Sequence, residues 1–368
     1  MRQLIAFIKR EAVLIVLLAA LIVIDIVHPQ PWRALVGMID RETMLTLGGL
    51  LVLTKAIEHT GAMDWAAHRL LHRVHSERGL ALVLVVFAAA LSTVLTNDVA
   101  LFAVIPIAIS IQQLVDLSLR RLVTVIALAV NAGSVLTPLG NPQNLFLWHA
   151  SGVSFGSFVL TLAPLTACLM IGLLALTSAL FKRNELDIPD GVETQPVDRA
   201  ALAGDAVLFA LFVVLADLHH AAIGCAIIGV VFAIKRWRTL VEIDWLLLVV
   251  FALMFVVLRS FANLPFVHEA LSHAKLDDPM HAFFIAAITS QVISNVPAAI
   301  MLESFTKHWQ PLAYGVSVGG FGWCIGSLAN LIAMRLAPVK GLFWRFHVVS
   351  VPFFVFALAV GAWLTRWI

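Results

Sequence analysis

The sequence predicts an all-helical membrane protein that crosses the bilayer several times. Of its 368 residues, 61% are hydrophobic and only 12% are charged, about half the charged fraction of a soluble domain. Apolar runs of helix-spanning length recur from one end of the chain to the other. Basic residues lie in twos and threes between these runs. Such small groups do not indicate nucleic-acid binding, but they do predict orientation.

The first two spans are expected at residues 11–27 and 43–57. The N-terminus faintly resembles a signal peptide, but no small-residue cleavage site follows its apolar run, so we interpret it as a retained span. Basic residues precede the first span and follow the second, which predicts that the N-terminus and the second loop are cytoplasmic. These residues are Arg2, Lys9 and Arg10, then Arg69, Arg73 and Arg78.

Residues 79–119 leave this basic loop and return to Arg120 and Arg121, so both ends lie on the cytoplasmic side. Each limb is about 16 residues or roughly 24 Å long, against a hydrocarbon core of about 30 Å. Two full spans are one interpretation. A re-entrant helical hairpin with Thr96, Asn97 and Asp98 at its tip fits the length better.

The next span, residues 121–148, is predicted to be broken. Two glycines and two prolines interrupt residues 131–144, among several amides and hydroxyls. Such a segment is tolerated at membrane depth where the freed backbone groups line a cavity or meet an ion.

The second half repeats this order of elements. A cytoplasmic linker and one connecting span occupy residues 184–220, and a second hairpin (280–306) and a second broken helix (311–337) follow. The connecting span inverts the second repeat relative to the first. We therefore predict about nine full spans plus two hairpins, in inverted repeats at 1–183 and 221–368, an architecture typical of secondary transporters.

The two predicted hairpin tips carry matching amides, Asn97 beside Thr96 and Asn295 beside Ser294. In an inverted pair the tips approach the midplane from opposite faces. Helix N-termini beyond each tip would offer N–H groups to an anion, and amide and hydroxyl oxygens suit sodium. The alternative is that the amides only satisfy contacts between helices.

A carboxylate such as Asp98 costs free energy inside the membrane unless it faces protein, water or an ion. No cationic residue lies nearby in sequence, so a proton, a bound cation or a distant basic residue must neutralise it. We therefore expect Asp98 to take a coupling proton or cation. A salt bridge to a residue such as Arg259 or Lys55 is the alternative.

Further candidates for substrate or ion binding lie in the broken helices. They are Asn131, Gly140, Asn141 and Asn144 in the first, and Ser327 and Asn330 in the second. Sodium, if it is the coupling ion, is expected at Asn97, Asp98 and Asn295. Paired catalytic acids, a zinc-spaced His pair and a phosphate-binding loop are not evident in the sequence, so we expect a transporter without a cofactor rather than an enzyme.

Three motifs resemble those of the ion transporter superfamily, which includes arsenite permeases, citrate transporters, divalent anion–sodium symporters and some sodium–proton antiporters. They are residues 95–101 (Leu-Thr-Asn-Asp-Val-Ala-Leu), residues 131–144, and residues 294–297 (Ser-Asn-Val-Pro). The resemblance covers nearly the whole chain, and it looks closest to arsenite-permease-like anion transporters of the bacterial inner membrane.

The resemblance implies a homodimer in which a transport part moves against a scaffold as an elevator. In the dicarboxylate branch, Ser-Asn-Thr motifs at both tips hold sodium and substrate carboxylates. Here the third positions are Asp98 and Val296, and an acid beside the first Asn looks more like the arsenite-permease and antiporter branches. We expect a transporter of a small anion or oxyacid, driven by a proton or sodium gradient. The alternative is a sodium–proton antiporter.

Overall fold

The computed structural model describes residues 12–71, 74, 76–114, 117–186 and 196–368. The predicted basic residues Arg2, Lys9, Arg10 and Arg73 lie outside the described residues. All regular secondary structure in the described part is helical, and one isolated bridge joins Ser76 to Glu185. The expectation of an all-helical fold is therefore confirmed.

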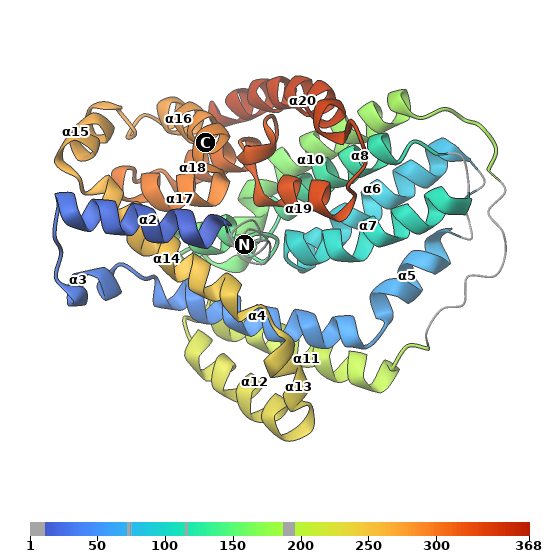
Figure 1. The fold of residues 1–368 in the computed structure, drawn as a ribbon, viewed down its shortest axis with the longest axis horizontal. Helices are drawn as coiled ribbons and strands as arrows, with labels where there is room; N and C mark the ends of the chain where they lie inside the picture. Colours follow the sequence, from blue (N-terminus) through green and yellow to red (C-terminus); the bar gives the residue numbers. More distant parts are fainter. Residues whose placement is uncertain (1–11, 72–73, 75, 115–116, 187–195) are drawn as a thin grey trace, which may run out of the picture.

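The first half of the chain runs from α2 to α10 (Figure 1). Its helices are α2 (Ala12–Val27), α3 (Trp32–Gly37), α4 (Arg41–His59), α5 (Ala62–Leu71), α6 (Glu77–Val94), α7 (Asn97–Leu114), α8 (Leu119–Ser134), α9 (Pro142–Ser151) and α10 (Phe155–Leu180). The predicted break within residues 121–148 is the segment between α8 and α9.

The second half runs from α11 to α20. Its helices are α11 (Arg199–Asp217), α12 (Ala221–Lys235), α13 (Trp237–Glu242), α14 (Trp245–Ala262), α15 (Pro265–His273), α16 (Pro279–Ile293), α17 (Asn295–Leu302), α18 (Trp309–Val318), α19 (Leu328–Leu336) and α20 (Leu342–Thr365). Two 3-10 turns, Glu303–Phe305 and Cys324–Gly326, follow α17 and precede α19. The short helices α3, α5, α13 and α15 lie in segments that the hydropathy pattern predicts to be loops.

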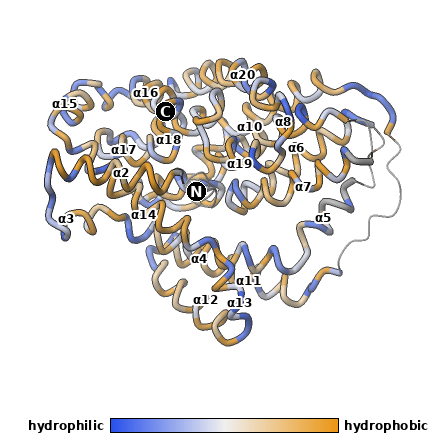
Figure 2. Tube along the Cα trace, in the orientation of Figure 1, coloured by the Kyte–Doolittle hydropathy of each residue, from blue (hydrophilic) through white to orange (hydrophobic). Residues whose placement is uncertain are grey.

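Within the described residues, five helices are long and apolar enough to cross a membrane, namely α6, α10, α11, α14 and α20. Shorter apolar helices include α2, α7, α12 and α16. Large apolar side chains point outward from these helices. Examples on α10 are Leu160, which is 76% exposed, and Ile171. Figure 2 shows apolar residues along the helices and polar residues in many of the connections. The chain is a multi-pass membrane protein, because only lipid makes such a surface favourable.

The limbs of the first predicted hairpin are longer than the sequence indicated. Helices α6 and α7 have 18 residues each, which corresponds to about 27 Å. Length therefore does not favour a re-entrant hairpin over two crossings. The second pair is unequal, because α16 has 15 residues and α17 only 8.

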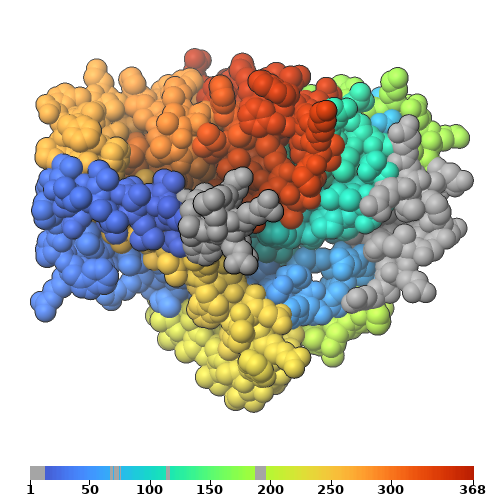
Figure 3. All heavy atoms as spheres, in the orientation of Figure 1, coloured from blue at the N-terminus to red at the C-terminus, as the bar shows by residue number. Residues whose placement is uncertain are grey.

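The helices form two groups that meet along α4 (Figure 1). Helices α11 and α12 pack against α4 and against each other, and they project from one side of the molecule. The other group contains α6 to α10 and α16 to α20, which contact one another. Figure 3 shows the C-terminal helices (red) directly against part of the first half of the chain (teal). Helix α8 lies in the centre of this group, and its residues from Leu122 to Ser134 are all buried.

Two glycines allow close contacts between helix backbones in this group. A Cβ at Gly133 of α8 would lie 2.6 Å from Ala89 Cα of α6. A Cβ at Gly315 of α18 would meet the main-chain oxygen of Phe283 and lie 2.7 Å from Ala286 Cβ, both on α16. Small residues at such positions let two membrane helices approach closely.

Candidate functional site

The two helix breaks meet at a pair of buried asparagines. Asn131 Nδ2 donates to Asn330 Oδ1 at 2.7 Å and to the Gly320 carbonyl oxygen at 3.3 Å. Asn330 Nδ2 donates to the same carbonyl at 2.9 Å. Asn131 is 4% exposed and Asn330 is fully buried. Two of the predicted site residues, 199 positions apart in the chain, are therefore direct partners.

The turn before α17 brings a third amide to this point. A Cβ at Gly320 would lie 3.3 Å from Asn295 Nδ2 and 3.7 Å from Asn131 Oδ1. Asn295 Oδ1 accepts from the Val296 N–H at 3.0 Å. Amides from three separate elements thus converge on Gly320, where any side chain would crowd them. Sequence reasoning missed Gly320, although the paired glycines Gly319 and Gly320 in an apolar run were a usable signal.

Ser294 precedes this turn in an unusual conformation, with φ at +76° and ψ at 156°. This region is essentially reserved for glycine, so a serine there is strained. Ser294 is also buried, with its hydroxyl 3.4 Å from Asn295 Oδ1. Strain of this kind concentrates at ligand-binding turns.

The first turn, between α6 and α7, is fixed to the first break. The Asn97 N–H donates to the Gly140 carbonyl oxygen at 2.9 Å. Thr137 Oγ1 donates to the Thr93 carbonyl oxygen at 2.5 Å, and Thr93 Oγ1 donates to the Gly133 carbonyl oxygen at 3.1 Å. The predicted site residues Thr96, Asn97 and Gly140 are therefore neighbours, and Thr96 and Asn97 are both buried.

Asn141 and Asn144 replace the backbone partners that are lost where α8 ends. Asn141 caps α9 by accepting from the Asn144 N–H at 2.9 Å, and its Nδ2 donates to the Ser134 carbonyl oxygen at 3.1 Å. Asn144 Nδ2 donates to the Ser134 and Val135 carbonyl oxygens at 3.1 and 3.0 Å. Helix ends leave such carbonyls without intrahelical partners, so these amides have a structural role.

Some buried oxygens in this region have no partner in the part of the chain that is described. They are Asn144 Oδ1, Gln143 Oε1 and Ser317 Oγ. A buried acceptor without a partner costs free energy, and an oxygen of this kind suits an alkali cation or a water molecule. Ser327, by contrast, is accounted for as the cap of α19, since its Oγ accepts from the Ala329 N–H at 3.3 Å.

Gln291 of α16 holds the second break in the way that Asn144 holds the first. Its Nε2 donates to the Gly319 and Phe321 carbonyl oxygens, both at 2.7 Å, and its Oε1 accepts from the Trp323 N–H at 2.8 Å. Sequence reasoning missed this residue. The signal was a single amide inside an apolar helix, three positions before Ser294.

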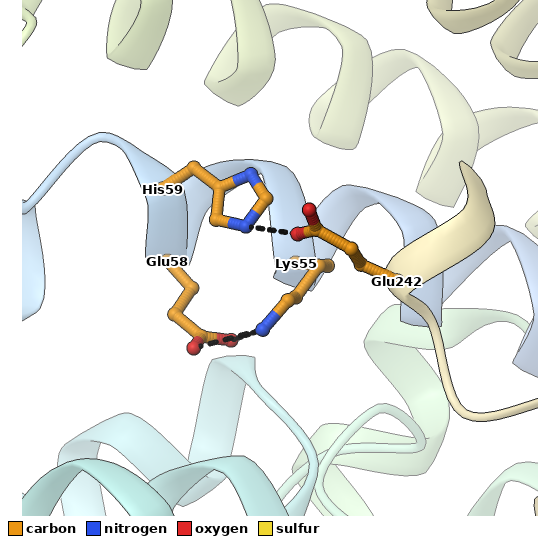
Figure 4. Close-up of polar contacts among 4 residues, drawn as sticks. All are labelled: Lys55, Glu58, His59 and Glu242. Carbon is orange, nitrogen blue, oxygen red and sulfur yellow. Dashed lines mark hydrogen bonds and ion pairs between the residues drawn. The ribbon is translucent and has the colours of Figure 1, made fainter. Parts of the chain in front are cut away.

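Asp98 is half-buried in the first turn of α7. Neither basic residue considered as its partner forms an ion pair with it among the described residues. Lys55 Nζ instead lies 3.0 Å from Glu58 Oε1 (Figure 4). Arg259 Nη2 lies 4.0 Å from Glu303 Oε2. A proton or a bound cation therefore stays the better prediction for neutralising Asp98.

Figure 4 also shows His59 Nε2 at 2.8 Å from Glu242 Oε2, which joins the end of α4 to α13. Lys55 and Glu58 line a cavity of about 420 Å³ together with Val99 and Phe102 of α7. On the α7 side, this cavity lies beside the helical turn from Val99 to Ala103, directly after Asp98. It gives the first turn of α7 a polar neighbourhood on the side of α4.

The fold and the site define a class, a multi-pass membrane transporter with two interrupted helices that meet through buried amides. The model of the CitMHS family, described as "Citrate transporter", matches residues 3–319. The chain therefore belongs to the citrate transporter family, within the ion transporter superfamily that its motifs resemble, and it is a transporter rather than an enzyme.

Several relatives are similar over nearly their whole length. Inner membrane protein YbiR of Escherichia coli strain K12 is 39% identical over 335 residues, which cover 90% of this chain and 89% of the relative. An uncharacterized transporter of Methanocaldococcus jannaschii is 28% identical over 345 residues, with 92% of each chain covered. An uncharacterized transporter of Mycobacterium bovis is 23% identical over 349 residues, with 84% and 81% covered.

Proposed function

We propose that this protein is a secondary active transporter of a small anion or oxyacid across the bacterial inner membrane, driven by a proton or sodium gradient. The convergence of Asn131, Asn295 and Asn330 on Gly320 carries the proposal. It places donors and acceptors from both halves of the chain at one buried point, where interrupted helices commonly hold substrate in secondary transporters.

The inverted-repeat architecture is part of this proposal. Two equivalent pairs, α6 with α8 and α16 with α18, make the most extensive helix contacts in the described fold. Gly133 of α8 approaches Ala89 and Ser92, eight and five residues before Asn97. Gly319 at the end of α18 approaches Ala287 and Ser290, eight and five residues before Asn295. We place the repeats at 1–183 and 221–368, with 184–220 between them and the N-terminus in the cytoplasm. The family resemblance adds to the proposal a homodimer in which a transport part moves against a scaffold as an elevator.

In this proposal the site side chains have different roles. Asn97 and Asn295, with Thr96 and Ser294 beside them, contact the substrate or the coupling ion. Asp98 takes the coupling proton or cation. If sodium is the coupling ion, the unpartnered Asn144 Oδ1 is an additional candidate ligand, because sodium is held by oxygens in sites of flexible geometry.

A binding screen is the first experiment. Purified protein is heated with citrate, arsenite or phosphate, each with and without sodium, and the unfolding temperature is measured. A ligand that binds the folded state raises this temperature. The ligand that stabilises most is then carried into an uptake assay.

The test of the site uses proteoliposomes with an imposed proton or sodium gradient. We expect Asp98→Asn and Asn97→Ala each to lower uptake at least about tenfold, the cost of losing a hydrogen bond to a charged partner. The matched controls are Asp277→Asn and Asn263→Ala, whose residues are exposed, and these should transport normally. Undiminished uptake in both site variants refutes the assignment of residues. Collapse of a pH gradient by sodium or lithium without any added anion indicates an antiporter instead.

A further inference from the structure

Two arginines hold the C-terminal end of α10. Arg78 Nε donates to the Phe181 carbonyl oxygen at 2.9 Å, and Arg121 Nη1 donates to the Leu180 carbonyl oxygen at 3.3 Å. Cations are favoured there because the last carbonyls of a helix lack intrahelical partners and carry partial negative charge. The first turns of α6 and α8 are thereby brought to the same end of the molecule as the last turn of α10.

More positive charge surrounds this end. A Cβ at Gly341 would lie 3.2 Å from Arg120 Nη1, which brings the start of α20 beside the start of α8. Arg345, in the first turn of α20, faces the like charges of Arg120 and Arg121. Its Nε is buried without a partner among the described residues. Lys182 and Arg183 are exposed at the same end. We refer to these residues together as the basic group, which consists of Arg78, Arg120, Arg121, Lys182, Arg183 and Arg345.

Among the described residues, no ion pair joins this basic group to a carboxylate. The ion pairs found there involve Lys55, His59, Arg236, Arg259 and His281, and none of these belongs to the basic group. Among the described residues, the side chain of Arg78 makes one hydrogen bond and that of Arg183 makes none, which leaves guanidinium N–H groups to bind an anion from outside the protein.

A cavity of about 970 Å³ opens at this basic group. Its lining includes Arg78 and Arg183, with Glu185 as the one acid among the lining residues. Ser76 and Glu185, which the isolated bridge joins, both line it. A space of this size accommodates a phosphate headgroup, and planar guanidinium groups suit phosphate geometry.

The cavity continues into an apolar stripe on α6. Arg78, Leu82, Val86 and Ala90 follow one another at four-residue intervals, so they lie on one face of the helix. Arg78 and Leu82 line the cavity, and Val86 is 49% exposed. Because α6 is apolar and long enough to span a membrane, this stripe faces hydrocarbon. Cations above an apolar stripe match the shape of a phospholipid rather than that of a free anion.

We propose that this cavity binds the phosphate headgroup of an anionic membrane phospholipid, with an acyl chain lying on the α6 stripe. Basic pockets between helices at the cytoplasmic surface favour such lipids. Arginines that only set orientation do not need to converge on a cavity, and the exposed Arg238 illustrates that simpler case. The proposal does not depend on which solute is transported.

Native mass spectrometry of delipidated protein tests it, with dioleoyl-phosphatidylglycerol added and dioleoyl-phosphatidylcholine for comparison. We expect phosphatidylglycerol to bind more tightly. Arg183→Gln should weaken its binding about fivefold, since each basic group near an anionic surface is worth about that factor. Glu185→Gln should strengthen binding, because it removes a negative charge from the cavity. Arg238→Gln is the matched control and should bind as the unmodified protein does.

Arg183 makes no hydrogen bond through its side chain among the described residues, so its replacement should leave the fold intact. Arg78→Gln is a second variant, and size-exclusion chromatography checks that it folds. Equal binding of the two lipids overturns the proposal, as does unchanged phosphatidylglycerol binding by Arg183→Gln. Displacement of the lipid by millimolar inorganic phosphate overturns the lipid assignment and indicates a free-anion site.

Discussion

At the scale of single residues, Asn131 and Asn330 depend on each other. Replacing Asn131 by Ala leaves the buried Asn330 Oδ1 without its donor at 2.7 Å. A buried acceptor left unpartnered costs about 1–3 kcal/mol, so we expect a clearly lower unfolding temperature in detergent.

The matched control for this substitution is Asn263→Ala, because Asn263 is exposed at the end of α14. It should leave the unfolding temperature within about 1 °C, since surface substitutions change stability little. An equal effect of both variants would show that the amide pair contributes nothing specific to stability.

The same residues show what a sequence can and cannot predict. An amide inside an apolar run must be buried and must find a partner, so Asn97, Asn131 and Asn295 could be selected without a structure. Their partners could not be named, because Asn131 and Asn330 are brought together only by the packing of whole helices. Gln291 was overlooked for a related reason, since its importance comes from carbonyls that are about 30 residues away.

At the scale of helices, Gly133 and Gly315 limit how closely the paired helices pack. We expect Gly133→Ala to lower the unfolding temperature, because its Cβ would fall 2.6 Å from Ala89 Cα and a main-chain atom cannot rotate away. Overpacking of this kind costs about 1–3 kcal/mol. Gly315→Ala should behave similarly against α16.

Gly229→Ala in α12 is the control for both glycine substitutions, because a Cβ there meets nothing within 4 Å. It should be neutral or stabilising, since alanine favours helices over glycine by up to about 1 kcal/mol. Equal melting temperatures for all three variants would mean that the close approach of these helices does not matter.

Helix boundaries can be predicted where the chemistry is local. The α9 start follows from Asn141 as cap and Pro142 in the first turn, a pairing visible in the sequence. Limb length in the first hairpin was underestimated because polar residues such as Ser76 and Glu77 begin α6 outside the apolar run. Hydropathy reports where a helix is apolar, and capping decides where it begins.

At the scale of the whole molecule, the inverted-repeat proposal makes a prediction about sidedness. The connection after α10 and the one before α16 should lie on opposite sides of the membrane. Lys182 and Asp277 mark these connections, and both are exposed. In a background where Cys168, Cys225 and Cys324 are replaced, Lys182→Cys and Asp277→Cys each provide a single reactive thiol.

A membrane-impermeant maleimide applied to spheroplasts should label Asp277→Cys at once and Lys182→Cys only after permeabilisation. The basic residues Lys182 and Arg183 favour the cytoplasm for the first connection, whereas the loop before α16 mixes acids with histidines. Arg238→Cys, in the short helix α13 between α12 and α14, is the internal control and should behave like Lys182→Cys. Labelling of Asp277→Cys and Lys182→Cys from the same side would refute the inversion, and with it the meeting of the two hairpin tips from opposite faces.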